Sequence, residues 1–149
     1  MKKFKFSLDS VLKWKLSLEE EALKLFGEAT RRRQEAFERL QSTRRCLGEL
    51  LKTIRDARAG RLEGWAQVAY LREAGRQESL CKNYEELLER ARIEEAKARE
   101  FYLGRRREAE AMQKLREKRY VSYEKDAERA IEKELEEIML SRNGKILCS

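Results

Sequence analysis

Proline is absent from all 149 residues of this sequence. Because proline disrupts a helix interior at a cost of about 3 kcal/mol, its absence permits very long uninterrupted helices. Asp, Glu, Lys and Arg make up 42% of the residues and aromatic residues only 8%. A chain this charged cannot fill a round core, but it can fill a narrow seam between helices. The composition therefore predicts an elongated helical protein that presents surfaces rather than an active-site cleft.

A heptad pattern of apolar residues runs through the first third of the chain. Apolar residues occupy 11 of its 15 seam positions, and Lys15, Glu19, Arg33 and Thr43 occupy the others. A pattern sustained over this many heptads is typical of a coiled coil. The apolar seam positions are Leu8, Leu12, Ala22, Phe26, Ala29, Ala36, Leu40, Leu47, Leu50, Ile54 and Ala57.

The pattern is interrupted at the segment RAGRLEG, where Gly60 and Gly64 predict a turn. Beyond it, two seams compete. One follows Tyr84, Leu88, Ala91, Ala98, Tyr102, Ala109 and Met112, and the other follows Leu80, Leu87, Phe101 and Leu115. We expect a single domain, with a first helix over about 7–57, a turn over 58–64, a second helix over 65–142 that Asn143-Gly144 caps, and a tail over 143–149.

The charge distribution predicts how the two helices pair. Residues 1–15 contain five lysines and one aspartate, whereas residues 124–137 contain seven acidic and three basic residues. Folding the chain about residue 63 brings these opposite blocks together and sets Cys46 level with Cys81, within reach of a short thiol crosslinker. A parallel dimer would instead stack like charges. The predicted fold is all-α, a long two-helix antiparallel coiled-coil hairpin, and it is monomeric.

Enzymatic chemistry has no support in the sequence. There is no histidine, and no glycine-rich phosphate loop or nucleophile motif is present. The three cysteines, Cys46, Cys81 and Cys148, lack metal-binding spacing and are expected to be free thiols. We therefore predict a non-enzyme without cofactor or metal. No apolar run is long enough to insert across a membrane.

Nucleic-acid binding receives little support, although the net charge is +7. Residues 1–57 contain 14 basic and 9 acidic residues, and the remainder contains 21 basic and 19 acidic residues. The basic excess is therefore expected to be spread along the chain. Protein binding is favoured by aromatic residues near both ends of the predicted hairpin, because aromatic residues are enriched in binding hot spots.

The opening residues FKFSLDSVLKWKLSLEEEA resemble the start of the flagellar FliJ family. That family begins with an aromatic pair flanking a basic residue, followed by leucine, an apolar pair, a basic site and an acidic run. Phe4, Phe6, Leu8, Leu12 and Glu19 are among the residues that fill these places. The length, the lack of proline and the acidic YEKDAERAIEKELEEI segment near the end are also similar to the family.

The resemblance implies a stalk-like component of the flagellar type III protein export apparatus. It implies binding to the hexameric export ATPase, contact with the membrane export gate and escort of export chaperones, in the cytoplasm at the inner membrane of the flagellar base. Its ring-facing residues would be Phe4, Phe6, Leu8, Leu12, Glu132 and Glu136. Its gate-facing residues, near the turn, would be Leu50, Trp65, Tyr70 and Leu71.

Two other functions compete with this one. The first is the equivalent stalk of a virulence type III secretion system, which shares the architecture. The second is a basic coiled coil that binds nucleic acid, with an affinity that falls steeply as salt rises. On the flagellar hypothesis, Phe6→Ala is expected to spare the fold and weaken binding to the ATPase ring.

Overall fold

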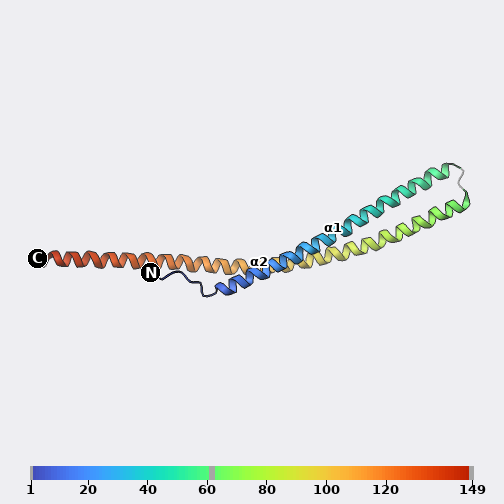
Figure 1. Cartoon of the computed structure of the whole chain (residues 1–149). Helices are drawn as coiled ribbons and strands as arrows, with labels where there is room; N and C mark the ends of the chain where they lie inside the picture. The colour runs from blue at the N-terminus through green and yellow to red at the C-terminus, as the bar shows by residue number, and fades with distance from the viewer. Residues whose placement is uncertain (1, 61–62, 148–149) are drawn as a thin grey trace. The chain divides into compact units, whose positions relative to one another are not determined.

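A computed structural model describes residues 2–60 and 63–147. Two helices account for nearly all of them, α1 (Asp9–Ala59) and α2 (Gly64–Leu147), and the described residues contain no strand (Figure 1). Contacts divide the chain into two compact units, each built from a stretch of both helices. The turn-side unit is Glu20–Leu103, and the terminal unit combines Met1–Glu19 with Gly104–Ser149.

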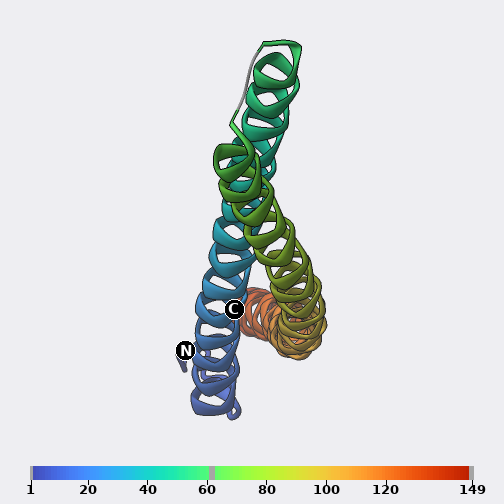
Figure 2. The ribbon, with the colours of Figure 1, turned by 90° about the vertical axis from the view of Figure 1, so that its right-hand side faces the viewer.

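In the turn-side unit the two helices pack side by side and run antiparallel (Figure 2). Arg33 pairs with Glu95, and Arg44 pairs with Glu85 at 3.0 Å, so residue numbers rise along α1 as they fall along α2. The same unit holds a core cluster of Leu40, Cys81 and Leu88, with Ala36, Leu47 and Tyr84 packed against it. The all-α antiparallel hairpin predicted from the sequence is confirmed.

The first seam is confirmed position by position. All 15 predicted positions from residue 8 to residue 57 are buried or half-buried. The polar positions are accommodated because their side chains reach partners at the edge of the seam. Lys15 pairs with Glu108, Arg33 pairs with Glu95, and the Thr43 hydroxyl donates a hydrogen bond to the carbonyl of Arg39.

On α2 the first of the two competing seams is the one that faces α1. All seven of its members, from Tyr84 to Met112, are buried or half-buried. In the second stripe, Leu80 and Leu115 are half-buried, whereas Leu87 and Phe101 are 46% and 49% exposed. That stripe therefore borders the seam rather than forming it.

The helix boundaries differ from the expected ones at three points. First, α1 begins at Asp9, and Ser7 accepts a hydrogen bond from Arg119. Second, α1 extends to Ala59 and α2 begins at Gly64, after Glu63, whose carbonyl accepts hydrogen bonds from Ala66 and Gln67. Residues 61 and 62 of the predicted turn lie outside the described residues.

Third, the expected helix end at Asn143-Gly144 is wrong. α2 continues through both residues to Leu147. A single glycine lowers helix propensity by about 1 kcal/mol relative to alanine, which the flanking helix formers can offset. Most of the expected tail is therefore helical, and Cys148 lies outside the described residues.

The two described cysteines do not share a surface. Cys46 is exposed, whereas Cys81 is buried in the core cluster of the turn-side unit. They are level along the helices, as the folding point predicts, but the Cys81 thiol is covered by α1. Ready crosslinking of the two thiols is therefore not expected from the folded chain.

Candidate functional site

The N-terminal segment before α1 is held against α2 by an aromatic cluster in the terminal unit. The ring of Phe4 meets the Tyr120 ring edge-on, with centroids 5.2 Å apart, and lies 5.5 Å from the Tyr123 ring. The guanidinium of Arg116 lies 5.7 Å from the Phe4 ring centroid. The Tyr123 hydroxyl donates a hydrogen bond to the carbonyl of Lys2. These contacts add to the two backbone hydrogen bonds that join the segment to α1, in which the carbonyls of Phe6 and Leu8 accept from Asp9 and Leu12.

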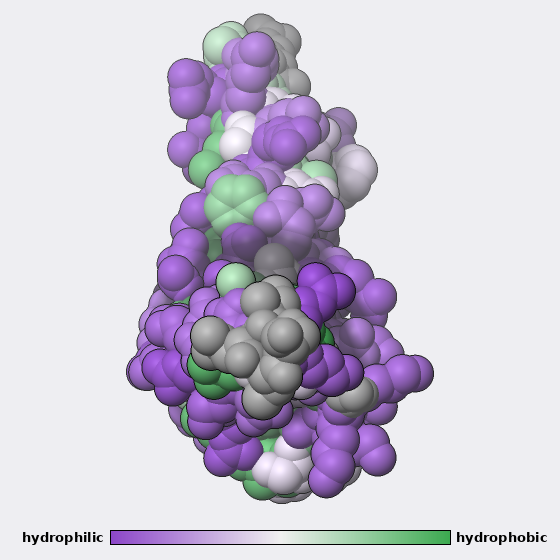
Figure 3. Space-filling model, turned by 90° about the vertical axis from the view of Figure 1, so that its left-hand side faces the viewer, coloured by the Kyte–Doolittle hydropathy of each residue, from purple (hydrophilic) through white to green (hydrophobic). Residues whose placement is uncertain are grey.

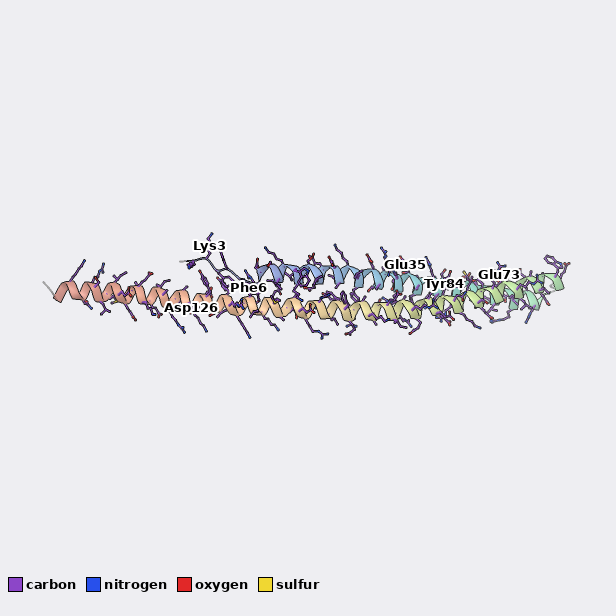
Figure 4. The ribbon with its side chains drawn as sticks, turned by 90° about the horizontal axis from the view of Figure 1, so that it is seen from below. Lys3, Phe6, Glu35, Glu73, Tyr84 and Asp126 are labelled. Carbon is purple, nitrogen blue, oxygen red and sulfur yellow. The ribbon has the colours of Figure 1, made fainter. Side chains whose placement is uncertain are left out.

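Phe6 packs more deeply than Phe4. Phe6 (Figure 4) is only 7% exposed. The Arg119 guanidinium lies 5.4 Å from the Phe6 ring centroid and donates a hydrogen bond to the Ser7 hydroxyl at 2.8 Å. Leu12 is also buried, and Leu8 is half-buried. Phe6→Ala would therefore remove buried contacts between the segment and α2, so we now expect this variant to destabilise the terminal unit.

Two segments of the terminal unit are rich in basic residues. Residues 1–15 and 112–123 together contain nine basic and two acidic residues, out of 35 and 28 in the chain, which leaves 26 of each elsewhere. The contacts of Phe4 with Tyr120 and of Ser7 with Arg119 bring the two segments side by side. We call residues 1–15 and 112–123 the basic cluster. The two segments therefore form one basic surface in the terminal unit, and the residues outside them carry equal numbers of acidic and basic groups.

An ion pair between the helices borders this cluster. The ammonium of Lys15 lies 3.0 Å from a carboxylate oxygen of Glu108, and Arg105 lies 3.3 Å from the same oxygen. The hydrogen bond from Lys15 is the main cause that holds the pKa of Glu108 below its ordinary value, and Arg105 acts in the same direction. Nearby, a hydrogen bond with Glu124 raises the pKa of Tyr120.

We predict that Lys15→Met raises the pKa of Glu108 toward its ordinary value, as measured by carbon NMR titration of the glutamate carboxyl. A carboxyl whose pKa is lowered by folding stabilises the fold above its unfolded pKa, and that contribution is lost as pH falls through the folded pKa. The difference in melting temperature between wild type and Lys15→Met should therefore shrink on acidification. Lys13→Met, which removes the exposed partner of Asp9 instead, is the control. If the pKa of Glu108 were the same in Lys15→Met as in wild type, the ion pair between Lys15 and Glu108 would be excluded.

Beyond the N-terminal segment, α2 continues without a facing stretch of α1. Every residue from Glu128 to Lys145 is exposed, including Glu132 and Glu136. We call 124–145 the α2 extension. The acidic block meets the basic segment only at its start, where Asp126 and Lys2 line one groove. Its exposed apolar residues were not predicted, although the folding point at residue 63 leaves this stretch without a partner helix: Ile131, Leu135, Ile138, Met139 and Leu140.

Figure 3 shows one face of the molecule, which is mainly hydrophilic with separate hydrophobic areas. Within the α2 extension, acidic side chains alternate with the exposed apolar ones because the two sets occupy neighbouring positions of the same helical turns. The extension therefore offers both hydrophobic and acidic groups to a partner, and no part of α1 competes for them.

The four residues predicted near the turn all belong to the turn-side unit. Trp65 is 73% exposed, Leu71 is half exposed, and Leu50 and Tyr70 are half-buried. The indole N–H of Trp65 donates a hydrogen bond to Glu63. Leu51 and Val68 are also exposed and were not predicted. The heptad periodicity alone does not predict which of the residues near the turn are exposed.

Potential metal ligands are not clustered in the part of the chain that the structure describes. Over residues 2–60 and 63–147, no three His, Cys, Asp or Glu side chains are grouped so that they could hold a metal ion. No described helix is long and apolar enough to cross a membrane. The described features are surfaces on paired helices, which suits contact with other macromolecules.

Comparison with known proteins gives one match. The family model of the flagellar FliJ protein matches residues 4–144, which is nearly the whole chain. No curated protein and no solved structure gives a significant match. The matched range includes the aromatic N-terminal segment, both helices and most of the α2 extension. This chain therefore belongs to the flagellar FliJ protein family and is a coiled-coil protein related to flagellar export.

Proposed function

We propose that this chain is a non-enzymatic, stalk-like component of the flagellar type III export apparatus. In this proposal it binds the export ATPase ring through its terminal unit and promotes assembly or activity of the ring. Residues near the turn contact the membrane export gate, and the chain also escorts export chaperones. It acts in the cytoplasm, peripherally attached to the inner membrane at the flagellar base.

The observation that carries the proposal is the terminal unit, in which a basic surface adjoins an unpaired acidic helix. The basic cluster holds a net charge of +7, the charge of the whole chain, and residues 124–137 hold −4. Complementary charges accelerate association and select partners more than they add affinity. Exposed Ile131, Leu135 and Ile138 supply apolar surface beside these charges. A partner with both signs of charge around an apolar groove fits this end.

The gate contact is proposed for the exposed apolar residues near the turn. Trp65, Leu71 and the neighbouring Val68 expose half or more of their surfaces. Tryptophan is among the residues that most often dominate binding energy when a partner buries it. Leu50 and Tyr70 are half-buried, so they would offer less surface to this contact.

The test is ATP hydrolysis by the flagellar export ATPase of the same organism, titrated with the purified chain. We expect saturable stimulation, which weakens as salt rises because exposed charges are screened. Phe4→Ala is the informative variant, since Phe4 is only half-buried and anchors the segment that carries three of the lysines. No stimulation by a folded chain, with an active ATPase, would reject the ring-binding proposal.

The concentrated basic cluster also favours a second candidate, binding to nucleic acid. Nine basic residues on two adjacent segments could neutralise several phosphates, which predicts a steep loss of affinity with salt. Titration of a fluorescent DNA duplex at about 50 and 150 mM salt separates the two functions. DNA binding at the lower salt concentration that weakens steeply at the higher one would favour this candidate, whereas negligible binding at both is expected of the stalk.

A further inference from the structure

The face of α2 that holds the N-terminal segment continues into the α2 extension. Tyr120 and Tyr123 contact the ring of Phe4, and Ala127, one turn further on, is half-buried. Apolar residues then follow at intervals of four and three residues: Ile131, Leu135 and Ile138. Such intervals keep side chains on one face of a helix. We call Ala127, Ile131, Leu135 and Ile138 the apolar stripe, and it begins where an internal contact of the chain ends.

The apolar stripe is open to solvent over most of its length. Ile131, Leu135 and Ile138 are 48%, 55% and 53% exposed. The N-terminal segment borders the start of the stripe, where Lys2 and Asp126 line one groove. From Glu128 onward every described residue of the extension is exposed. The stripe therefore extends the face that binds the N-terminal segment by about three helical turns that the described chain leaves uncovered.

Charged residues of the extension are sorted around the helix relative to this stripe. With about 100° of rotation per residue, the five charged residues of 124–137 that lie nearest the stripe are all acidic. They are Glu124, Glu128, Glu132, Glu134 and Glu137. The three basic residues of the same stretch follow one another at intervals of four on the far side: Lys125, Arg129 and Lys133. The stripe is thus flanked by negative charge until Arg142 ends it.

An apolar stripe with acidic borders suits a helix of the opposite character. In a two-helix coiled coil the apolar side chains interdigitate along the seam, and the charged residues that border it select the partner. The chain already uses this arrangement nearby, where Lys15 of α1 pairs with Glu108 of α2. A helix with Lys or Arg beside its apolar positions would meet Glu128 and Glu134 in the same way. A second α2 extension would set acidic residues against acidic ones, and nucleic acid or an anionic membrane surface would be repelled.

We propose that the α2 extension pairs with a basic amphipathic helix of a partner protein, which packs on the apolar stripe and continues the helix pairing beyond the N-terminal segment. This inference rests on the proposed function, in which the export ATPase ring binds the terminal unit and supplies the helix. From Ala127 to Ile138 the stripe spans about 17 Å at 1.5 Å per residue. The apolar contacts provide affinity, and the charges beside them select the partner and its orientation.

The first test compares two leucines of the extension in the ATPase titration. Leu135 lies on the stripe, whereas Leu140 lies about 140° around the helix from it and is the more exposed of the two, at 70% against 55%. Leu135→Ala should raise the concentration of the chain needed for half-maximal stimulation roughly tenfold, and Leu140→Ala should change it by less than about twofold. Alanine preserves helix propensity, so a loss would not reflect unfolding of the extension.

This comparison separates the inference from the proposed function. If wild type stimulates the ATPase and the two variants behave alike, the stripe does not bind the ring. That result overturns the inference and leaves the binding of the ring to the terminal unit in place.

The second test does not involve the ATPase. The probe is a synthetic peptide of about three heptads with Leu at positions a and d and Lys at e and g, titrated into the full chain, and the same peptide with Glu at e and g is the control. We expect the Lys peptide to bind wild type and Leu140→Ala equally and Leu135→Ala roughly tenfold more weakly, and the Glu peptide to bind none of them. This pattern without ATPase stimulation would reject the proposed function and still support a basic helix as the partner of this face. Equal binding of the two peptides, equal binding to the two variants, or no binding of the Lys peptide would overturn the inference.

Discussion

Leu40→Asp is expected to lower the free energy of unfolding by about 3–5 kcal/mol, enough to unfold much of the chain near room temperature. Leu40 is 2% exposed and lies in the cluster with Cys81 and Leu88. An aspartate there loses its hydration, and the residues packed around Leu40 include no cation that could pair with the carboxylate. Urea denaturation followed by helical circular dichroism measures the loss.

Leu87→Asp is the matched control for this prediction. It makes the same chemical change on the partner helix, but Leu87 is 46% exposed and borders the seam. Arg39 and Arg90 line the same groove as Leu87 and could form an ion pair with the new carboxylate. We expect a change of less than about 1 kcal/mol. If the two variants were equally stable, the seam would not be the principal source of stability in the turn-side unit.

The first helix could be predicted in detail because its heptad pattern is a strictly local signal. Seam positions repeat at fixed intervals, so the heptad register could be assigned although four of the positions are polar. Two of these polar residues, Lys15 and Arg33, lie at the interface with α2. On α2 the signal was ambiguous, since large apolar residues occur both in the seam and beside it. Only pairing with α1 decides that Tyr84 is half-buried and Leu87 is exposed.

The candidate site was less predictable because it depends on contacts between distant residues. Residues 112–123 carry a modest local charge, and they form a basic cluster only when Phe4 reaches Tyr120 across the helix pair. The burial of Phe6 beside Arg119 likewise has no periodic signature, since the segment before Asp9 is not helical. The exposure of the α2 extension follows simply from α1 being the shorter helix.

The double variant Glu132→Lys/Glu136→Lys is expected to raise the concentration of the chain needed for half-maximal ATPase stimulation by roughly tenfold. Reversal of two exposed charges in a complementary interface changes binding by about 1–2 kcal/mol, and about 1.4 kcal/mol corresponds to a factor of ten. Both glutamates lie in the α2 extension, where no residue of α1 depends on them. The fold should therefore be unaffected, which circular dichroism verifies.

Glu78→Lys/Glu86→Lys makes the same change in net charge on exposed positions of the turn-side unit, and it should leave stimulation as in wild type. The comparison matters because any increase in positive charge would alter attraction to an acidic protein in a general way. A loss specific to Glu132 and Glu136 locates the contact on the α2 extension. Equal effects of the two double variants would instead mean that the ATPase responds to net charge alone, and the extension would then be excluded as the ring-binding surface.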